Sequence, residues 1–137
     1  FVMHPGGDAV VFDAKGNPKW QGTLKYKGFG PACAVADGDF VWCTYPENNA
    51  VIKFNTTSML ADFKISGGTT DKFVSPHGLY IVDRKLIVTS SETGTIFSID
   101  LDNFRENIIY ELDEPVYQYI KIDSNEIILT KSGIYRL

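Results

Sequence analysis

The sequence predicts an all-β chain built from repeated units of four short antiparallel strands, and three observations carry this prediction. First, the segment that begins at Pro31 repeats without gaps in the segment that begins at Pro76, 45 residues later. A fixed repeat of this length is typical of folds made from stacked or ring-forming units. Second, apolar residues inside each repeat follow the period of two that strands show, and no segment carries a sustained helical stripe. Third, residues that favour tight turns separate the apolar runs.

The clearest repeat shows its four strands in order. Two short runs rich in β-branched residues flank the turn Asp83-Arg84-Lys85, and a second turn at 91–94 leads into two further runs. We expect the strands at residues 79–82, 86–89, 95–100 and 108–112. Four antiparallel strands in sequence order make up one blade of a β-propeller.

The flanking segments carry weaker copies of the same unit. Residues 4–11 align with 45–52, and Ile127-Ile128-Leu129-Thr130 aligns with Leu86-Ile87-Val88-Thr89. The first copy lacks its innermost strand and the last copy stops in its third strand, which predicts fourteen strands in all. We therefore predict a single partial propeller with blades at residues 1–27, 28–66, 67–113 and 114–137.

An incomplete ring creates a physical problem. Propellers close with about four to eight blades, and each blade buries its faces only against its neighbours. Three and a half blades leave two apolar end faces uncovered. The chain also begins at Phe1 rather than at Met. We expect an excised part of a larger ring, and the alternative is self-association that completes the ring.

Composition removes several classes of function. The chain has 44% apolar and 22% charged residues and a net charge of −4, so it lacks the basic stripe that nucleic-acid binding needs. It contains no apolar run long enough to insert into a membrane. Phosphate-binding loops, dinucleotide fingerprints and nucleophile elbows are missing, and no cofactor is expected. We expect a soluble chain and leave its compartment open, with secretion and the periplasm among the alternatives.

Residues 75–83 and 85–100 resemble a blade of the NHL/YVTN-type β-propellers. The shared pattern is Pro-x-Gly-Leu at the opening of the inner strand, an apolar strand that ends in Thr, then Gly-Thr-Ile and a closing Ile-Asp. Blade two matches in part, with Cys33 and Asn49 where the two glycines stand. The resemblance implies a propeller fold. Members of this broad group include protein- and RNA-binding modules, ligand binders, and lyases or lactone hydrolases.

His77 is the candidate for a site. The innermost strand of a blade lines the central channel, so Pro76-His77-Gly78 places an imidazole near the channel mouth, where it can bind a ligand or exchange protons. Histidines at this place serve catalysis in streptogramin-lyase-like and amidating-lyase-like relatives. The equivalent positions here are Ala32 and a position near Tyr117, so one histidine stands without the further ligands that a metal site needs. The alternative is a purely structural role, in which His77 lies in a turn and forms a hydrogen bond to the backbone.

We predict His77, Tyr117 and Tyr45 as ligand-binding residues, with His77 also the only catalytic candidate, and no metal site. Tyrosines at the channel rim suit recognition because they offer large contact areas at a low entropic cost. His4, in the His4-Pro5-Gly6-Gly7 segment, is expected to serve only a turn.

Cys33 and Cys43 are symmetric about Gly38. If Asp37-Gly38-Asp39 is a three-residue hairpin loop, the two sulfurs stand opposite each other and a cross-strand disulfide is conceivable. Two buried, reduced cysteines are the expected alternative.

These observations favour a non-catalytic binding module that recognises a protein or a small molecule on its loop face or channel. The alternative is a part of a propeller lyase or hydrolase, in which His77 supplies an acid, a base or a metal ligand.

Overall fold

The structure is a computed structural model that describes residues 1–4, 6–65 and 74–137. These residues form fourteen strands in four separate antiparallel sheets, which contain three, four, four and three strands in chain order. This confirms the predicted all-β fold with four-stranded antiparallel blades in an incomplete ring. The described residues contain one short helix, a single 3-10 turn, and no helix among them is long and apolar enough to cross a bilayer.

Each sheet is formed by strands that follow one another in the chain. Blade one consists of β1 (Val2–Met3), β2 (Asp8–Phe12) and β3 (Pro18–Thr23). Blade two consists of β4 (Cys33–Asp37), β5 (Phe40–Tyr45), the 3-10 turn η1 (Pro46–Asn48), β6 (Ala50–Asn55) and β7 (Ala61–Ile65). Blade three consists of β8 (Pro76–Val82), β9 (Lys85–Ser90), β10 (Thr95–Asp100) and β11 (Glu106–Glu111). Blade four consists of β12 (Val116–Ile122), β13 (Asn125–Thr130) and β14 (Ile134–Arg136).

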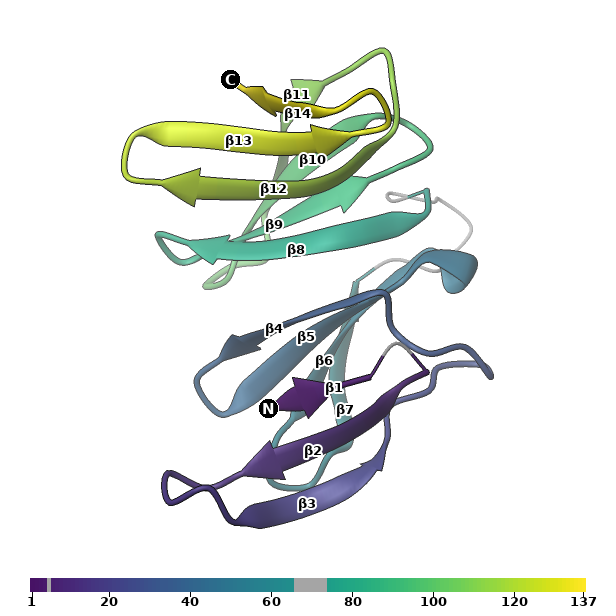
Figure 1. Ribbon diagram of the computed structural model, residues 1–137, viewed down its shortest axis with the longest axis vertical. Coiled ribbons are helices and arrows are strands. Elements are labelled where there is room, and N and C mark those ends of the chain that lie inside the picture. Colours follow the sequence, from purple (N-terminus) through teal and green to yellow (C-terminus); the bar gives the residue numbers. More distant parts are fainter. Residues whose placement is uncertain (5, 66–73) are drawn as a thin grey trace.

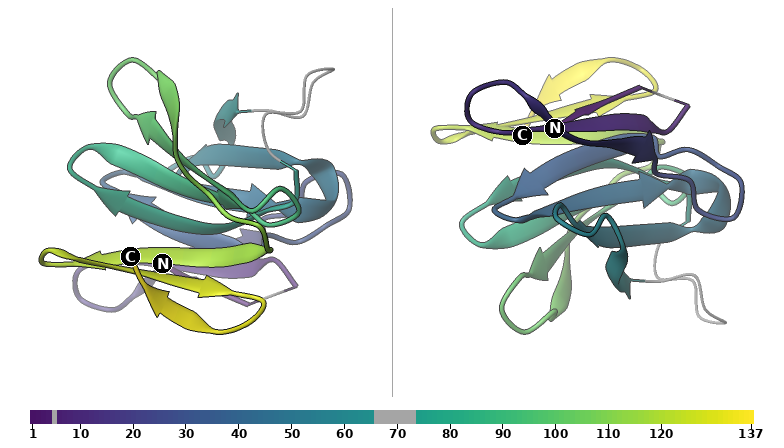
Figure 2. Two further views of the ribbon diagram at one scale, coloured as in Figure 1. Left: turned by 90° about the horizontal axis from the view of Figure 1, so that it is seen from above. Right: turned by 90° about the horizontal axis from the view of Figure 1, so that it is seen from below.

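The four sheets are stacked face to face in chain order along the long axis of the molecule (Figure 1). Blade one lies at one end of the stack and blade four, with the C-terminus, lies at the other. Views along this axis show that successive sheets are turned relative to one another, as blades are (Figure 2). The predicted boundary between blades two and three, at residues 66 and 67, lies outside the described residues.

The core consists of three apolar clusters, one at each junction between successive blades. Val41, Cys43 and Ile52 of blade two pack against Ala9 and Val11 of blade one. The second cluster joins blade two to blade three and contains Trp42, Val51, Leu79, Leu86 and Val88. The third joins blade three to blade four and contains Ile87, Ile96, Val116, Tyr119 and Ile128. Because both faces of a middle blade are covered, its strands are apolar on both sides.

The hairpin turns are tighter than the sequence predicts. Lys85 pairs with Val82, so the turn in blade three contains only Asp83 and Arg84. Both residues have positive φ, at 50° and 58°, as a two-residue turn that matches the twist of its strands requires.

The hairpin turn of blade two also contains two residues instead of the expected three, and this changes the position of the cysteines. Asp37 pairs with Phe40, so Cys33 lies opposite Thr44 and Cys43 lies opposite Ala34. A shift of one residue places two side chains on opposite faces of a sheet. The cross-strand pairing of the two sulfurs is therefore wrong, and both cysteines are free thiols.

The alignment of blade four with blade three also changes by one residue. The hairpin of blade three closes at Val82 and Lys85, and that of blade four closes at Ile122 and Asn125. Counted from these turns, Leu129 occupies the place of Thr89. The sequence alignment, which set Thr130 on Thr89, is therefore wrong by one position.

Candidate functional site

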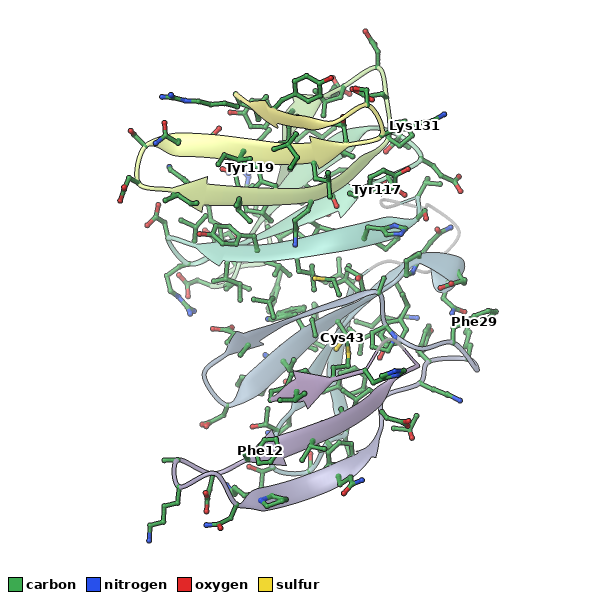
Figure 3. All side chains as sticks on the ribbon, in the orientation of Figure 1. Phe12, Phe29, Cys43, Tyr117, Tyr119 and Lys131 are labelled. Carbon is green, nitrogen blue, oxygen red and sulfur yellow. The ribbon has the colours of Figure 1, made fainter. Side chains whose placement is uncertain are left out.

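The starts of the innermost strands bring two predicted site residues together. His77 in β8 and Tyr117 in β12 lie at equivalent positions of adjacent blades, and their rings meet edge to face with centroids 5.6 Å apart. Both side chains are half-buried. Figure 3 shows Tyr117 at the start of β12, on the side of the molecule where β8 also starts. Ala32, the third equivalent residue, precedes β4 and contributes only a methyl group.

Two buried threonines fix the backbone of both site residues. The Thr44 hydroxyl accepts the Cys33 N–H at 3.1 Å and donates to the His77 carbonyl at 2.7 Å. The Thr89 hydroxyl likewise accepts the Gly78 N–H at 2.8 Å and donates to the Tyr117 carbonyl at 3.1 Å. Each hydroxyl thus joins the innermost strand of its own blade to that of the next blade.

The close approach of blades three and four depends on Gly78. A Cβ atom at this position would overlap the side chain of Gln118 and the carbonyl oxygen of Tyr117. Only glycine leaves room for the two innermost strands to approach so closely. The ring contact between His77 and Tyr117 follows from this approach.

The imidazole of His77 lies against the backbone of Ser75. Its Nδ1 is 3.3 Å from the Ser75 carbonyl oxygen, which also accepts the N–H and the hydroxyl of Ser91 at 3.0 and 2.9 Å. Ser75 has a φ of 56° and donates its N–H to Oδ1 of Asn49 at 2.9 Å. Nε2 of His77 has no hydrogen-bond partner among the described residues.

The third predicted residue, Tyr45, does not lie at this site. It is fully buried between blades one and two, where its hydroxyl donates to the Leu24 carbonyl at 2.9 Å. Its ring contacts Tyr26 edge to face. Burial raises the pKa of Tyr45 above its ordinary value. A ligand at the mouth cannot reach this phenol.

His4 lies in blade one, away from His77. Its Nδ1 accepts the Gly6 N–H at 3.2 Å, and its carbonyl accepts the Gly7 N–H at 2.8 Å. These bonds close a turn; Pro5, the remaining residue of the predicted turn, lies outside the described residues. Among the residues that are described, no three His, Cys, Asp or Glu side chains converge as metal ligands do.

A cleft of about 280 Å³ at the turn ends of blades two and three was not predicted. Its walls include Phe40, Trp42 and Arg84. Lys53, which also lines it, lies 3.9 Å from the centre of the Phe40 ring and 3.3 Å from Asp62. Its residues come from separate strands and turns of two blades, so no local motif in the sequence marks it.

The roles of Thr44 and Thr89 were also missed. The signal was available, because the two threonines are identical residues 45 positions apart in the repeat. An unexplained polar residue that repeats inside an apolar strand is a candidate for a bond between units.

Comparison with known proteins supports the architecture. No protein-family model matches the chain, and no curated protein matches it in sequence. Among solved structures, the computationally designed Ika8 protein is similar with a TM-score of 0.68 and 12% identity, over 98% of this chain and 41% of that protein. Virginiamycin B lyase from Staphylococcus aureus is similar with a TM-score of 0.66 and 16% identity, over 96% and 48%. The WD40 repeats of RRP9 are similar with a TM-score of 0.67 and 9% identity, over 93% and 40%.

The fold is an incomplete β-propeller. The chain spans less than half the length of each of these three structures. At such low identities the likeness shows the fold alone. The matches include a lyase and a WD40 protein, and they do not single out the NHL/YVTN type.

Proposed function

We propose that this chain is a non-catalytic binding module of the NHL/YVTN type, which recognises a small molecule or a protein segment at the mouth formed by its innermost strands. The observation that carries the proposal is the edge-to-face pair of His77 and Tyr117. Two threonine hydroxyls and one glycine position its backbone, and both rings remain half-exposed.

The chemistry of the pair indicates the ligand class. In the tautomer that carries its proton on Nδ1, His77 offers Nε2 as an acceptor, and the hydroxyl of Tyr117 can donate or accept. Neither atom has a hydrogen-bond partner among the described residues. The two rings add apolar area beside these polar atoms. A flat group that carries an N–H or O–H donor, such as an aromatic amide, fits this combination.

The residues around His77 favour binding over catalysis. General acid–base chemistry needs a second group that binds or moves the reacting atoms. The other two equivalent positions hold the methyl group of Ala32 and the phenol of Tyr117, and neither position holds a carboxylate or an amine beside His77. His77 is engaged with backbone through Nδ1, which suits a fixed acceptor.

A fragment screen by saturation-transfer NMR tests the proposal, with a set of small aromatic amides and phenols as probes. We expect hits whose binding weakens roughly tenfold in His77→Ala and in Tyr117→Phe, the loss of about 1.4 kcal/mol that one hydrogen bond contributes. His4→Ala is the matched control, because His4 lies in a turn of blade one.

Two outcomes contradict a binding role at this mouth. Fragments that bind equally well to all variants would place the ligand elsewhere. Conversion of a bound fragment to product, lost in His77→Ala, would favour the lyase or hydrolase alternative.

A further inference from the structure

The face of blade four that points away from blade three is apolar and uncovered. Ile128 is buried against blade three, so the neighbouring Ile127 and Leu129 point to the opposite side. Their cross-strand partners Ile120 and Ile134 extend this side over all three strands. We call this surface the free face of blade four; it consists of Ile120, Ile122, Ile127, Leu129 and Ile134.

The other blades show what normally covers this face. Ile134 occupies in blade four the place that Val51 and Ile96 occupy in blades two and three. Val51 and Ile96 are 0% exposed, whereas Ile134 is 74% exposed. The difference arises because blades three and four cover the first two residues, and no described residue covers Ile134.

At the internal junctions, the same face of the following blade covers the preceding blade. At each junction the first three strands of the following blade present their backward face, the side toward the preceding blade. Val51 is packed in this way with Leu79, Leu86 and Val88, and Ile96 with Tyr119 and Ile128. A forward face therefore meets a backward face at these two junctions, and Ala9 and Val11 of blade one meet Val41 and Cys43 of blade two in the same way at the remaining one.

Blade one presents the only backward face in the described chain that lacks a preceding blade. Ala9 and Val11 are buried against blade two, so Val10 and Phe12 point away from it. Val2 pairs with Val10 and lies on the same side. We call Val2, Val10 and Phe12 the free face of blade one.

The free face of blade four is a forward face and the free face of blade one is a backward face, and such a pair meets at each internal junction. Val2 is 61% exposed and Phe12 is 39% exposed, and a hollow of about 720 Å³ lies beside Val2 and Val10. The hollow is also lined by Asp8, Gln21 and Thr23, so Val2 and Val10 supply its apolar contacts to the free face of blade four. Figure 1 shows that blades one and four lie at opposite ends of the stack, so one molecule cannot join its own ends.

We propose that the free face of blade four binds the free face of blade one of a second copy of this chain, head to tail, so that two copies close one ring. Such an interface joins two different surfaces, and it yields a closed ring when the rotation between copies returns to the start. Two identical junctions then cover all four end faces. Burial of the aliphatic side chains supplies the driving force.

Light scattering coupled to size exclusion of the 137-residue chain tests this proposal. We expect a discrete species of twice the 15.3 kDa chain mass. The double variant Leu129→Lys/Ile134→Lys blocks one face, and Val2→Lys/Phe12→Lys blocks the other. Each should reduce the mass to that of a monomer while circular dichroism shows unchanged strand content, because all four positions are exposed to solvent in the single chain.

A mixture of the two double variants adds a stricter test. Each retains one intact face, so the mixture can form one of the two junctions. It should show a species of dimer mass that neither variant forms alone, and this species should need a higher protein concentration than the wild-type dimer. Leu60→Lys is the matched control, because Leu60 is 70% exposed but lies between β6 and β7, outside both free faces. This control should remain dimeric.

Three results would overturn the proposal. A monomeric wild-type chain would mean that another partner, such as further blades of a longer polypeptide, covers these faces. Loss of the dimer in only one of the double variants would indicate a symmetric contact between two copies of the same face. A polydisperse aggregate would show that the junction does not close.

Discussion

Thr44 and Thr89 make the same two hydrogen bonds in successive blades. Each hydroxyl accepts an N–H from the innermost strand of its own blade and donates to a carbonyl of the next innermost strand. Both side chains are buried, at 0% and 1% exposure. A hydroxyl suits this place because it is both a donor and an acceptor. These bonds give the apolar junctions a fixed register at the candidate site.

Replacement of Thr89 by valine should destabilise the fold by about 1–3 kcal/mol, because the Gly78 N–H and the Tyr117 carbonyl lose a buried partner. Valine keeps the shape of threonine, so the loss reports the hydroxyl. Urea denaturation followed by tryptophan fluorescence measures the effect. Thr23→Val is the control, since its hydroxyl bonds only to the exposed Asp8 side chain. Equal stability of Thr89→Val and the wild type would show that the bonds do not stabilise the junction.

The strands were predictable because their pattern is local. The expected strand at 95–100 matches β10, and the expected runs at 79–82 and 86–89 lie within β8 and β9. Turn residues and a period of two suffice for such predictions. The sequence predicted that His77 and Tyr117 occupy equivalent positions in adjacent blades. It could not predict that their rings touch, because this contact depends on how closely the two blades approach at Gly78.

The apolar runs did not show which residue of blade four corresponds to which residue of blade three. Residues 86–89 and 127–130 are both strings of β-branched and aliphatic residues that end in threonine. A strand with apolar residues on both faces has no polar side to fix its phase, so a slip of one residue leaves the pattern unchanged. The two-residue turn before each second strand decides the register instead, and it places Leu129 rather than Thr130 at the site of Thr89.

Tyr45 should make the stability of the fold depend on alkaline pH. Burial raises its pKa in the folded state above the value near 10 of an exposed tyrosine. The unfolded chain then loses this proton first, so its contribution is fully present below about pH 10 and is lost as the pH rises further. Tyr45→Phe should cost about 1–3 kcal/mol at neutral pH, since the Leu24 carbonyl loses its donor, and should flatten the alkaline decline.

Urea midpoints measured between about pH 8 and pH 11 check this expectation. Tyr135→Phe serves as the control because the Tyr135 side chain is 46% exposed. It should leave the alkaline decline in place. A decline that is equally steep in Tyr45→Phe would assign the effect to other groups, such as Tyr119, whose pKa is also raised by burial.

The two thiols should remain reduced and differ in reactivity while the chain is folded. Cys43 is fully buried between blades one and two (Figure 3), and burial raises its pKa to about 12. At pH 8.5 its thiolate fraction is then below about one in a thousand, and the thiolate is the reactive form. Iodoacetamide followed by mass spectrometry should modify the half-buried Cys33 first and Cys43 only in urea. Cys33→Ser assigns the remaining signal. An intramolecular disulfide formed by mild oxidation, with native fluorescence retained, would contradict the register in which Cys33 lies opposite Thr44 and Cys43 opposite Ala34.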